Sequence, residues 1–337
     1  MTVTKIGVLM IQLGTPDEPT PAAVRRYLRE FLSDRRVIEE PPLKWWFVLN
    51  CFILPRRSKE SAAKYARIWD PQTGSPLLHI TRLQAAAVER SLPGGFAVQV
   101  GMRYGEPSIE SALGQLISTG IDRIVVLPMY PQYSAASTGT ACDKLFDALR
   151  KRRLVPSIRV VPPFFDHAGY VRAQASLVRA ELSRLDRQPD KIVFSFHGYP
   201  VDFVRKGDPY QEQAETTAKL LARGLDLSDD DWMLTYQSRF GRQLWIEPFT
   251  EETLCQLARD GARRVLVASP GFTTDCLETI DEVGREVAES FRAAGGEQFI
   301  RCPCLNDSPA WIDAMTELVL TESRGWYPDN GQAGASA

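Results

Sequence analysis

His197 is the side chain of this sequence best suited to proton transfer or metal binding near neutral pH. The chain has only three histidines, and His197 ends the apolar segment KIVFSFH at 191–197, directly before Gly198. A neutral imidazole, whose ordinary pKa is about 6.5, can accept a proton or bind a borderline metal. A lone histidine after a strand is more often a structural hydrogen-bonding group, but its place where the chain turns favours chemistry. The glycine that follows would let a large planar ligand approach the backbone.

A second candidate is a run of carboxylates in segment 273–290, which has helical periodicity. The acidic side chains on one side of this helix are Asp275, Glu278, Asp281, Glu282 and Glu289. Such a stripe is usually a solvated face. Asp275 and Glu278, however, lie at the helix start, where neighbouring carboxylates raise one another's pKa and attract a hard or borderline cation. Together with His197 they predict a small site for a metal or a proton, with too few ligands for a closed structural zinc.

Alternating strand-like and helical segments indicate the fold that must position these residues. Short apolar segments are separated by helical periodicity, which is the pattern of βαβ units around a parallel sheet. The expected strands are 6–13, 96–102, 123–130, 158–164, 191–197, 231–238, 263–270 and 298–304. Four strands followed by four predict an α/β protein of two similar Rossmann-like domains. Each would be a four-stranded parallel sheet flanked by helices, with a cleft between the domains.

Helices with one apolar side are expected between the strands, at 21–33, 107–119 and 250–260. Another, at 309–322, follows the last strand and would dock on the first domain, and the tail after Tyr327 is expected to fray. The predicted domains are therefore 1–165 plus 306–337, and 166–305. The carboxyl ends of parallel strands, where polar side chains gather in this sequence, would face the interdomain cleft.

Composition limits the classes of function. The 40 Lys and Arg residues against 42 Asp and Glu residues give a net charge of -2, and no basic arm is present. Nucleic acid is therefore not expected as a partner. No glycine-rich phosphate-binding motif follows a strand, so a nucleotide is not expected either. The 6 cysteines are scattered, without a C-x-x-C pair, which fits a reducing cytoplasm.

One apolar segment, WWFVLNCFIL at 45–54, is too short to cross a bilayer, which needs about 20 apolar residues. It is flanked by Lys44 and by Arg56 and Arg57. The segment is either a buried helix or an exposed lip that holds an apolar substrate and rests on a membrane surface. The second alternative would place a cytoplasmic protein peripherally on the inner face of the cytoplasmic membrane, through residues 43–57.

Long motifs are distributed in order along nearly the whole chain. They include VLMIQLGTPDEPT (8–20), MRYGEPSIESAL (102–113), LPMYPQYSAASTG (127–139), FSFHGYP (194–200), LTYQSRFGRQLWIEP (234–248) and PGFTTDCLETIDEV (270–283). Together they resemble the ferrochelatase family, lyases that insert Fe(II) into a porphyrin in the last step of heme biosynthesis. The form is most similar to that of Gram-negative bacteria. The resemblance implies a chelatase-type version of the two-domain fold, with protoporphyrin IX and Fe(II) as substrates.

The resemblance also implies roles for individual residues. His197 and Glu278 match the active-site histidine and glutamate of the family, which are assigned to iron binding and to removal of the pyrrole protons. Glu282 and Glu286 match acidic positions on a helix that the family widens toward the π form, and with Asp275 they would relay protons or iron. The positions that match porphyrin contacts are Leu13, Arg57, Ser75, Arg103, Tyr104, Tyr130, Arg239 and Trp245. The propionate contacts among them are Arg57, Ser75 and Arg239.

Fe(II) would be a substrate, and no cofactor is expected. Some relatives bind a [2Fe-2S] cluster through cysteines near the C-terminus and one in the YPQYS loop. Here that loop continues with Ala135 and Ala136, and no cysteine follows Cys304, so no cluster is expected. Cys276 stands where many relatives have a histidine. The alternatives are a chelatase specific for coproporphyrin, cobalt or nickel, a tetrapyrrole carrier without turnover, and a two-domain nucleotide enzyme.

Overall fold

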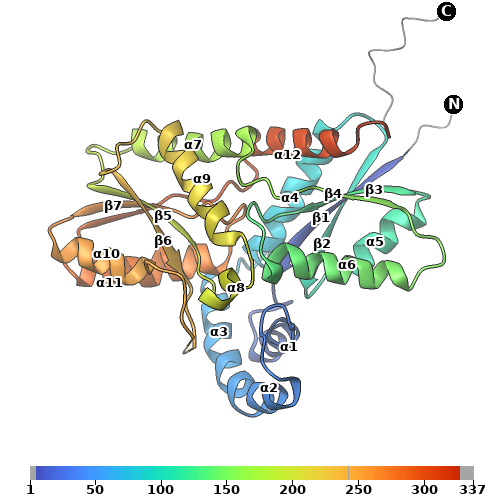
Figure 1. The fold of residues 1–337 in the computed structure, drawn as a ribbon, viewed down its shortest axis with the longest axis horizontal. Helices are drawn as coiled ribbons and strands as arrows, with labels where there is room; N and C mark the ends of the chain where they lie inside the picture. Colours follow the sequence, from blue (N-terminus) through green and yellow to red (C-terminus); the bar gives the residue numbers. More distant parts are fainter. Residues whose placement is uncertain (1–4, 242, 327–337) are drawn as a thin grey trace, which may run out of the picture.

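Two α/β halves, each built on its own parallel sheet, lie side by side in the computed structural model, which describes residues 5–241 and 243–326 (Figure 1). The strands of the first sheet are β1 (Ile6–Gly14), β2 (Phe96–Tyr104), β3 (Arg123–Pro128) and β4 (Ser157–Val160). Those of the second are β5 (Lys191–His197), β6 (Trp232–Gln237), β7 (Arg264–Ala268) and β8 (Gln298–Arg301). The strand orders, β2-β1-β3-β4 and β6-β5-β7-β8, are equivalent. The predicted fold class of two similar four-stranded parallel units is confirmed.

The eight predicted strands are present, but several end earlier than expected. β4 ends at Val160 and β8 ends at Arg301, just before Pro162 and Pro303. Proline has no backbone N–H and therefore cannot continue a hydrogen-bonded ladder. The apolar character of the residues beyond these points reflects burial of a loop rather than a longer strand.

The helices of the first half flank its sheet and also build a projection. They are α1 (Pro21–Leu32), α2 (Pro42–Val48), the π-helix η1 (Leu49–Ile53), α3 (Leu54–Ile68), α4 (Pro76–Ser91), α5 (Ile109–Ser118), the π-helix η2 (Ala135–Gly139) and α6 (Thr140–Arg150). The predicted helix 107–119 begins only at Ile109, because Ser108 caps it with a hydroxyl that accepts a hydrogen bond from the Ser111 N–H. In Figure 1, α1, α2 and α3 project beyond both sheets. We call the tip of this projection, residues 42–57, the lip.

The helices of the second half include one that joins the two cores. They are α7 (Ala168–Ser183), α8 (Val201–Arg205), α9 (Tyr210–Gly224), α10 (Thr250–Arg259), the π-helix η3 (Glu278–Val287), α11 (Ala288–Ala293) and α12 (Pro309–Glu322). Tyr170 of α7 is buried in the core of the first half, whereas Val178 of the same helix is buried in that of the second. Helix α12 packs on the first half through Trp311 and Met315, as expected. The domain limits at 165 and 306 stay a prediction, and the tail after Tyr327 lies outside the described residues.

Within residues 5–241 and 243–326, no helix is long and apolar enough to cross a bilayer.

Candidate active site

His197 lies at the carboxyl end of β5 with one ring nitrogen engaged by the backbone. Its Nδ1 is 2.6 Å from the carbonyl oxygen of Gly198. Because a carbonyl can only accept a hydrogen bond, this contact places the proton on Nδ1 and leaves a free lone pair on Nε2. Burial lowers the pKa of His197, and the charge of Glu278 opposes this shift. The imidazole is therefore a neutral base near pH 7, and a nearby carboxylate can stabilise its protonated form.

Gly198 has a different role from the one that the sequence suggested. A Cβ atom added there would lie 2.9 Å from the carbonyl oxygen of Gln237 and 3.2 Å from the Trp245 ring. The absent side chain thus makes room for Trp245 and the neighbouring strand β6, not for a ligand above the backbone. Trp245 is buried and pairs in a β-bridge with Pro200. The close packing fixes the turn that follows His197.

Glu278 is the first residue of η3 and lies within electrostatic reach of several buried groups. Burial raises the pKa of Tyr27 and of Tyr65 well above its usual value, and the charge of Glu278 raises each further. The thiol pKa of Cys276 is raised in the same way, by burial and then by Glu278. Tyr27 and Tyr65 were not predicted as site residues. In the sequence they occupy apolar helix positions that look like core, and no local signal separates them from other buried tyrosines.

Two further carboxylates follow Glu278 along η3, and each has a polar partner. The Ser238 hydroxyl donates to the Glu282 carboxylate, at 2.8 and 2.9 Å from its two oxygens. Burial nevertheless raises the pKa of Glu282 to about 7, and the charge of Glu278 adds to the shift. Ser238 adopts a left-handed backbone conformation with φ 67°. This is uncommon for a residue with a side chain and often marks a functional position. The expected π-helical form of this segment is confirmed.

The outermost carboxylate, Glu286, is held by cations. The Lys64 ammonium of α3 lies 2.7 and 2.8 Å from its two oxygens, and Arg285 Nη2 lies 2.9 Å from Oε1. We call Glu278, Glu282 and Glu286 the carboxylate row. The carboxylate row therefore begins near His197 and ends at Glu286, which forms an ion pair with Lys64 of the first half.

Asp275 belongs to a separate buried network just before η3. Its carboxylate accepts hydrogen bonds from Arg301 Nη1 at 2.6 Å and Asn306 Nδ2 at 2.8 Å, and from the Thr279 hydroxyl at 2.8 Å. Its backbone N–H also donates to Asn306 Oδ1. These contacts fix the start of the π-helix. A relay role for Asp275 stays a prediction.

Two of the predicted porphyrin contacts, Arg57 and Trp245, lie against one aromatic ring, that of Phe240. The Arg57 guanidinium lies 5.6 Å from the centroid of the Phe240 ring, and the Trp245 ring lies 4.9 Å from it, edge on. Arg239, the residue before Phe240, instead lies 4.1 Å from the centroid of the Phe249 ring and pairs with Glu252 at 2.7 Å. Both guanidinium groups are largely exposed. Since Trp245 also packs on Gly198, this group joins the lip to the end of β5.

A second group of predicted contacts comes from the first half. Leu13 and Tyr104 belong to one apolar cluster with Leu277, the residue before Glu278. The hydroxyl of Tyr130 is buried and without a hydrogen-bond partner among the described residues. Its pKa is raised chiefly by burial, and next by the neighbouring Tyr199. Tyr130 therefore lies where the two halves meet, beside the turn that carries His197.

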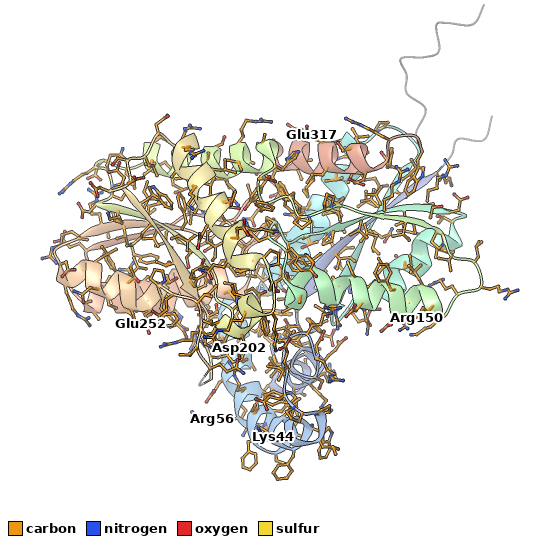
Figure 2. The ribbon with its side chains drawn as sticks, viewed as in Figure 1. Lys44, Arg56, Arg150, Asp202, Glu252 and Glu317 are labelled. Carbon is orange, nitrogen blue, oxygen red and sulfur yellow. The ribbon has the colours of Figure 1, made fainter. Side chains whose placement is uncertain are left out.

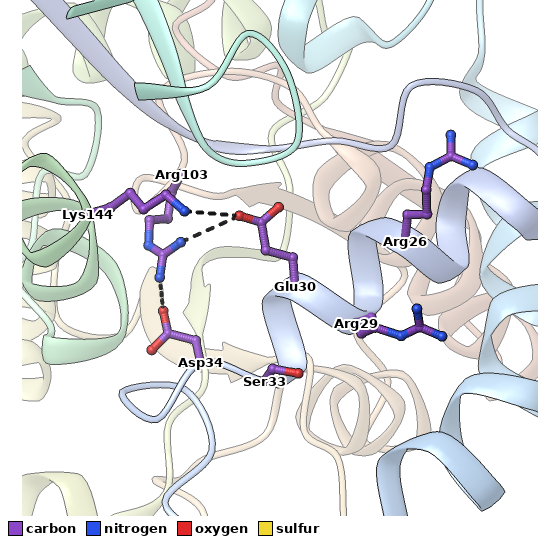
Figure 3. A pocket seen from close by; sticks show the side chains of 7 residues that line it. All are labelled: Arg26, Arg29, Glu30, Ser33, Asp34, Arg103 and Lys144. Atoms are coloured by element: carbon purple, nitrogen blue, oxygen red, sulfur yellow. Dashed lines mark hydrogen bonds and ion pairs between the residues drawn. The ribbon is translucent and has the colours of Figure 1, made fainter. Parts of the chain in front are cut away.

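Two predicted contacts lie in other surroundings. The guanidinium of Arg103 is bound by Asp34 and the Thr140 hydroxyl and approaches Glu30. It lines a cavity of about 530 Å³ next to α1, in which Lys144 also faces Glu30 (Figure 3). Ser75 precedes α4 and lines a different cavity, of about 420 Å³, with Trp69. Contact of Arg103 and Ser75 with a porphyrin stays a prediction.

Within 5–241 and 243–326, no group of three or more His, Cys, Asp or Glu side chains is arranged to hold a metal ion. Cys276, Cys302 and Cys304 are buried free thiols, and the pKa of each is raised by burial. A metal-binding role for His197 and Glu278 stays a prediction.

Solved structures with a similar fold are chelatases. The chain superimposes on SirB from Bacillus subtilis with Fe3+ at a TM-score of 0.55 and 14% identity, covering 95% of this chain and 96% of the other. It superimposes on the sirohydrochlorin chelatase SirB from Bacillus subtilis subspecies spizizenii, in complex with cobalt, at 0.56 and 11% identity, covering 96% and 97%. At these identities the likeness concerns the fold alone.

Sequence relatives are much closer. A ferrochelatase from a Bradyrhizobium species is 45% identical over 328 residues, which is 96% of this chain and 93% of that protein. A ferrochelatase from Chromobacterium violaceum is 46% identical over 326 residues, covering 96% and 89%. The ferrochelatase family model matches residues 5–323. A match of this extent, with relatives so similar along the same length, shows that the chain belongs to the ferrochelatase family, whose members insert iron into a porphyrin for heme synthesis.

Proposed function

We propose that the porphyrin is protoporphyrin IX, that the metal is Fe(II), and that His197 and Glu278 are the catalytic pair. The observation that carries this assignment is the contact between His197 Nδ1 and the Gly198 carbonyl. It leaves Nε2 as an unprotonated base beside a carboxylate. Insertion converts one porphyrin and one Fe(II) into one heme and two protons. Both pyrrole N–H bonds break, and their electron pairs become bonds to the metal.

His197 accepts one of these protons at Nε2. Burial keeps the imidazole neutral beforehand, and the negative charge of Glu278 stabilises the imidazolium that forms. Glu278 is the nearest member of the carboxylate row to receive the second proton or to hold the incoming iron. Glu282, with a pKa of about 7, can exchange protons with the next carboxylate at neutral pH. Asp275, which precedes Glu278 on the chain, would join the relay from the side opposite Glu282.

The porphyrin is held by the two groups of side chains described above. Arginine forms bidentate pairs with carboxylates, so Arg57 and Arg239, together with Ser75, suit the propionates. Leu13, Tyr104, Tyr130 and Trp245 would contact the apolar macrocycle, with Arg103 at its edge. The exposed apolar side chains of the lip favour protoporphyrin over the more acidic coproporphyrin.

We further propose that the protein works in the cytoplasm, in peripheral contact with a membrane through the lip, and without an iron–sulfur cluster. Leu43, Trp46 and Phe52 of the lip are 89%, 65% and 64% exposed, and Lys44 and Arg56 flank them at the end of the projection (Figure 2). Apolar side chains next to cations suit the boundary between acyl chains and phosphates. Ala135 and Ala136 occupy the loop in which cluster-binding relatives have a cysteine.

An anaerobic assay with Fe(II), following the loss of porphyrin fluorescence, tests the catalytic pair and the choice of porphyrin. The wild type is expected to consume protoporphyrin faster than coproporphyrin. His197→Ala should lower kcat by about 100-fold or more, the range of a lost general base, and Glu278→Gln should also lower kcat. Both variants should still bind protoporphyrin in a fluorescence titration.

His79→Ala serves as the matched control, because His79 lies on α4 and has no part in the proposed site. Full activity of His197→Ala and Glu278→Gln would contradict the assignment of the pair. Preference for coproporphyrin would contradict the substrate, while leaving the pair in place.

A further inference from the structure

Among residues 5–241 and 243–326, Lys64 is the one cation from the first half of the molecule that forms an ion pair with the carboxylate row. It lies on α3, whose first residues continue from the lip, and its ammonium contacts both oxygens of Glu286. Both side chains are only partly buried, at 37% and 35% exposure. The pair is therefore accessible to ions from solvent.

A divalent cation and the ammonium of Lys64 would compete for the same oxygens. Glu286 has two cationic neighbours, Lys64 and Arg285. Arg285 has alternatives, because it also pairs with Asp281 at 2.6 Å and with Glu289 at 3.3 Å. Among the contacts of the described residues, the only ion pair of Lys64 is the one with Glu286. Lys64 contacts both oxygens of Glu286, whereas Arg285 contacts one, so loss of the Lys64 pair would free more of the carboxylate than loss of the Arg285 contact.

The residue type suits a displaceable partner. Lysine carries a compact, strongly hydrated charge on a flexible stem, whereas arginine binds carboxylates as a rigid fork. An ammonium that leaves Glu286 can remain in water, since the side chain is already more than one-third exposed. Displacement by a metal would thus cost little beyond the ion pair itself.

We propose that Lys64 occupies the outer end of the carboxylate row until a divalent metal displaces it, and that this competition sets the apparent affinity for Fe(II). Lys64 is a positioning residue in this scheme, because it acts through Glu286. The inference rests on the proposed route of iron along the carboxylate row. In this scheme Lys64, a residue of the first half, controls the access of the metal to the carboxylate row, which belongs to the second half.

The test measures KM for Fe(II) and kcat separately, in anaerobic assays with saturating protoporphyrin. Lys64→Met should lower KM by about three- to tenfold, the effect of removing a unit charge close to a screened divalent ion. Its kcat should stay unchanged. Lys64→Arg keeps the charge but presents a rigid fork that is harder to displace, so its KM should be equal to or higher than that of the wild type. Lys59→Met is the matched control: Lys59 lies on the same helix, is exposed, and has no ion pair among the described residues, so KM should not change.

A double-mutant cycle separates this inference from the route itself. Glu286→Gln should raise KM for Fe(II), and adding Lys64→Met to that variant should have no further effect. If Glu286→Gln raises KM but Lys64→Met leaves it unchanged, the route stands and the role of Lys64 is wrong. If Glu286→Gln itself leaves KM unchanged, the route fails, and the role of Lys64 fails with it. An equal fall of KM in Lys59→Met would also overturn the proposal, since a general field effect would explain it.

Discussion

At the scale of single residues, individual hydrogen bonds and burial set the protonation states of the side chains in the site. A carbonyl oxygen fixes the tautomer of His197, and a serine hydroxyl partly offsets the burial of Glu282. The pKa values of His197 and Glu282 shift in opposite directions. Burial lowers the pKa of the imidazole and raises that of the carboxyl, because it disfavours the charged form of each. The first shift keeps the imidazole unprotonated at neutral pH, and the second lets the Glu282 carboxyl gain or lose a proton near pH 7.

The pH dependence of activity should report on Glu282. Its carboxyl has a pKa of about 7, so the ionised form that can attract iron is lost as the pH falls below 7. Ser238→Ala removes hydrogen bonds that stabilise the ionised form, and should therefore raise this pKa. The acid limb of the kcat/KM profile for Fe(II) should move to higher pH by about 0.5 to 1 unit, as expected for a lost hydrogen bond to a charge.

The measurement is kcat/KM for Fe(II) between pH 5.5 and 8.5 in wild type, Ser238→Ala and Glu282→Gln. Glu282→Gln should lack this limb and show lower values throughout. An acid limb that stays in place in both variants would assign it to another group. Ser228→Ala is the matched control, because Ser228 is exposed beyond the opposite end of β6 from Ser238, and its hydroxyl donates to Asp231.

At the scale of elements, the lip separates residues that hold its fold from residues that face outward. Trp45 is partly buried, and its indole N–H donates to the carbonyl oxygen of Leu32 at 2.6 Å. Trp46 and Phe47, the next two residues, are 65% and 54% exposed. The segment is thus neither wholly buried nor wholly exposed, and its contact with a substrate or a membrane stays a prediction. One side of the lip is core, and the other is an apolar surface.

Replacing Leu43, Trp46, Phe47 and Phe52 with Ser should abolish most of the association with anionic liposomes while leaving the fold intact. The apolar area that would enter the lipid boundary is lost, and the buried Trp45 is kept. Flotation of the protein with phosphatidylglycerol vesicles is the readout. Phe146→Ser, which removes an aromatic side chain that is 47% exposed elsewhere, should float like the wild type. Undiminished flotation of the lip variant would count against membrane contact.

At the scale of the whole molecule, the two halves are joined by shared packing. Helix α7 contributes to both cores. Asp208 of the second half accepts hydrogen bonds from the Ser134 hydroxyl and the Ala135 N–H of the first. Gln132 donates to the Thr217 hydroxyl across the same boundary. The site lies where the halves meet, so these contacts also set the distance between its two walls.

A single unfolding transition is therefore expected in calorimetry. Met315→Ala in the first core and Leu221→Ala in the second should each destabilise the protein by about 2–4 kcal/mol, and each should lower the same Tm. Leu154→Ala, at a side chain that is 70% exposed, should change Tm little. Two separate transitions, each moved by only one core variant, would show that the halves unfold independently.

The sequence predicted the parts of this structure that depend on local patterns. Alternation of apolar segments with helical periodicity located eight strands and their two groups of four, and His197 stood out because it ends a strand. Contacts across long sequence separations left no such pattern. Lys64 and Glu286 are 222 residues apart, and a lysine on a surface helix looks like any other. Gly198 was assigned to ligand approach because its true neighbour, Trp245, lies on a different segment.

The single free nitrogen of His197 constrains the order of events in a catalytic cycle. With Nδ1 committed to the Gly198 carbonyl, the ring is loaded and emptied through the same atom, and it can take only one of the two pyrrole protons in each turnover. In the proposed site that atom would face the macrocycle for as long as heme is bound. In the proposed cycle His197 would therefore lose its proton only as heme departs. The next cycle could then begin only after heme release.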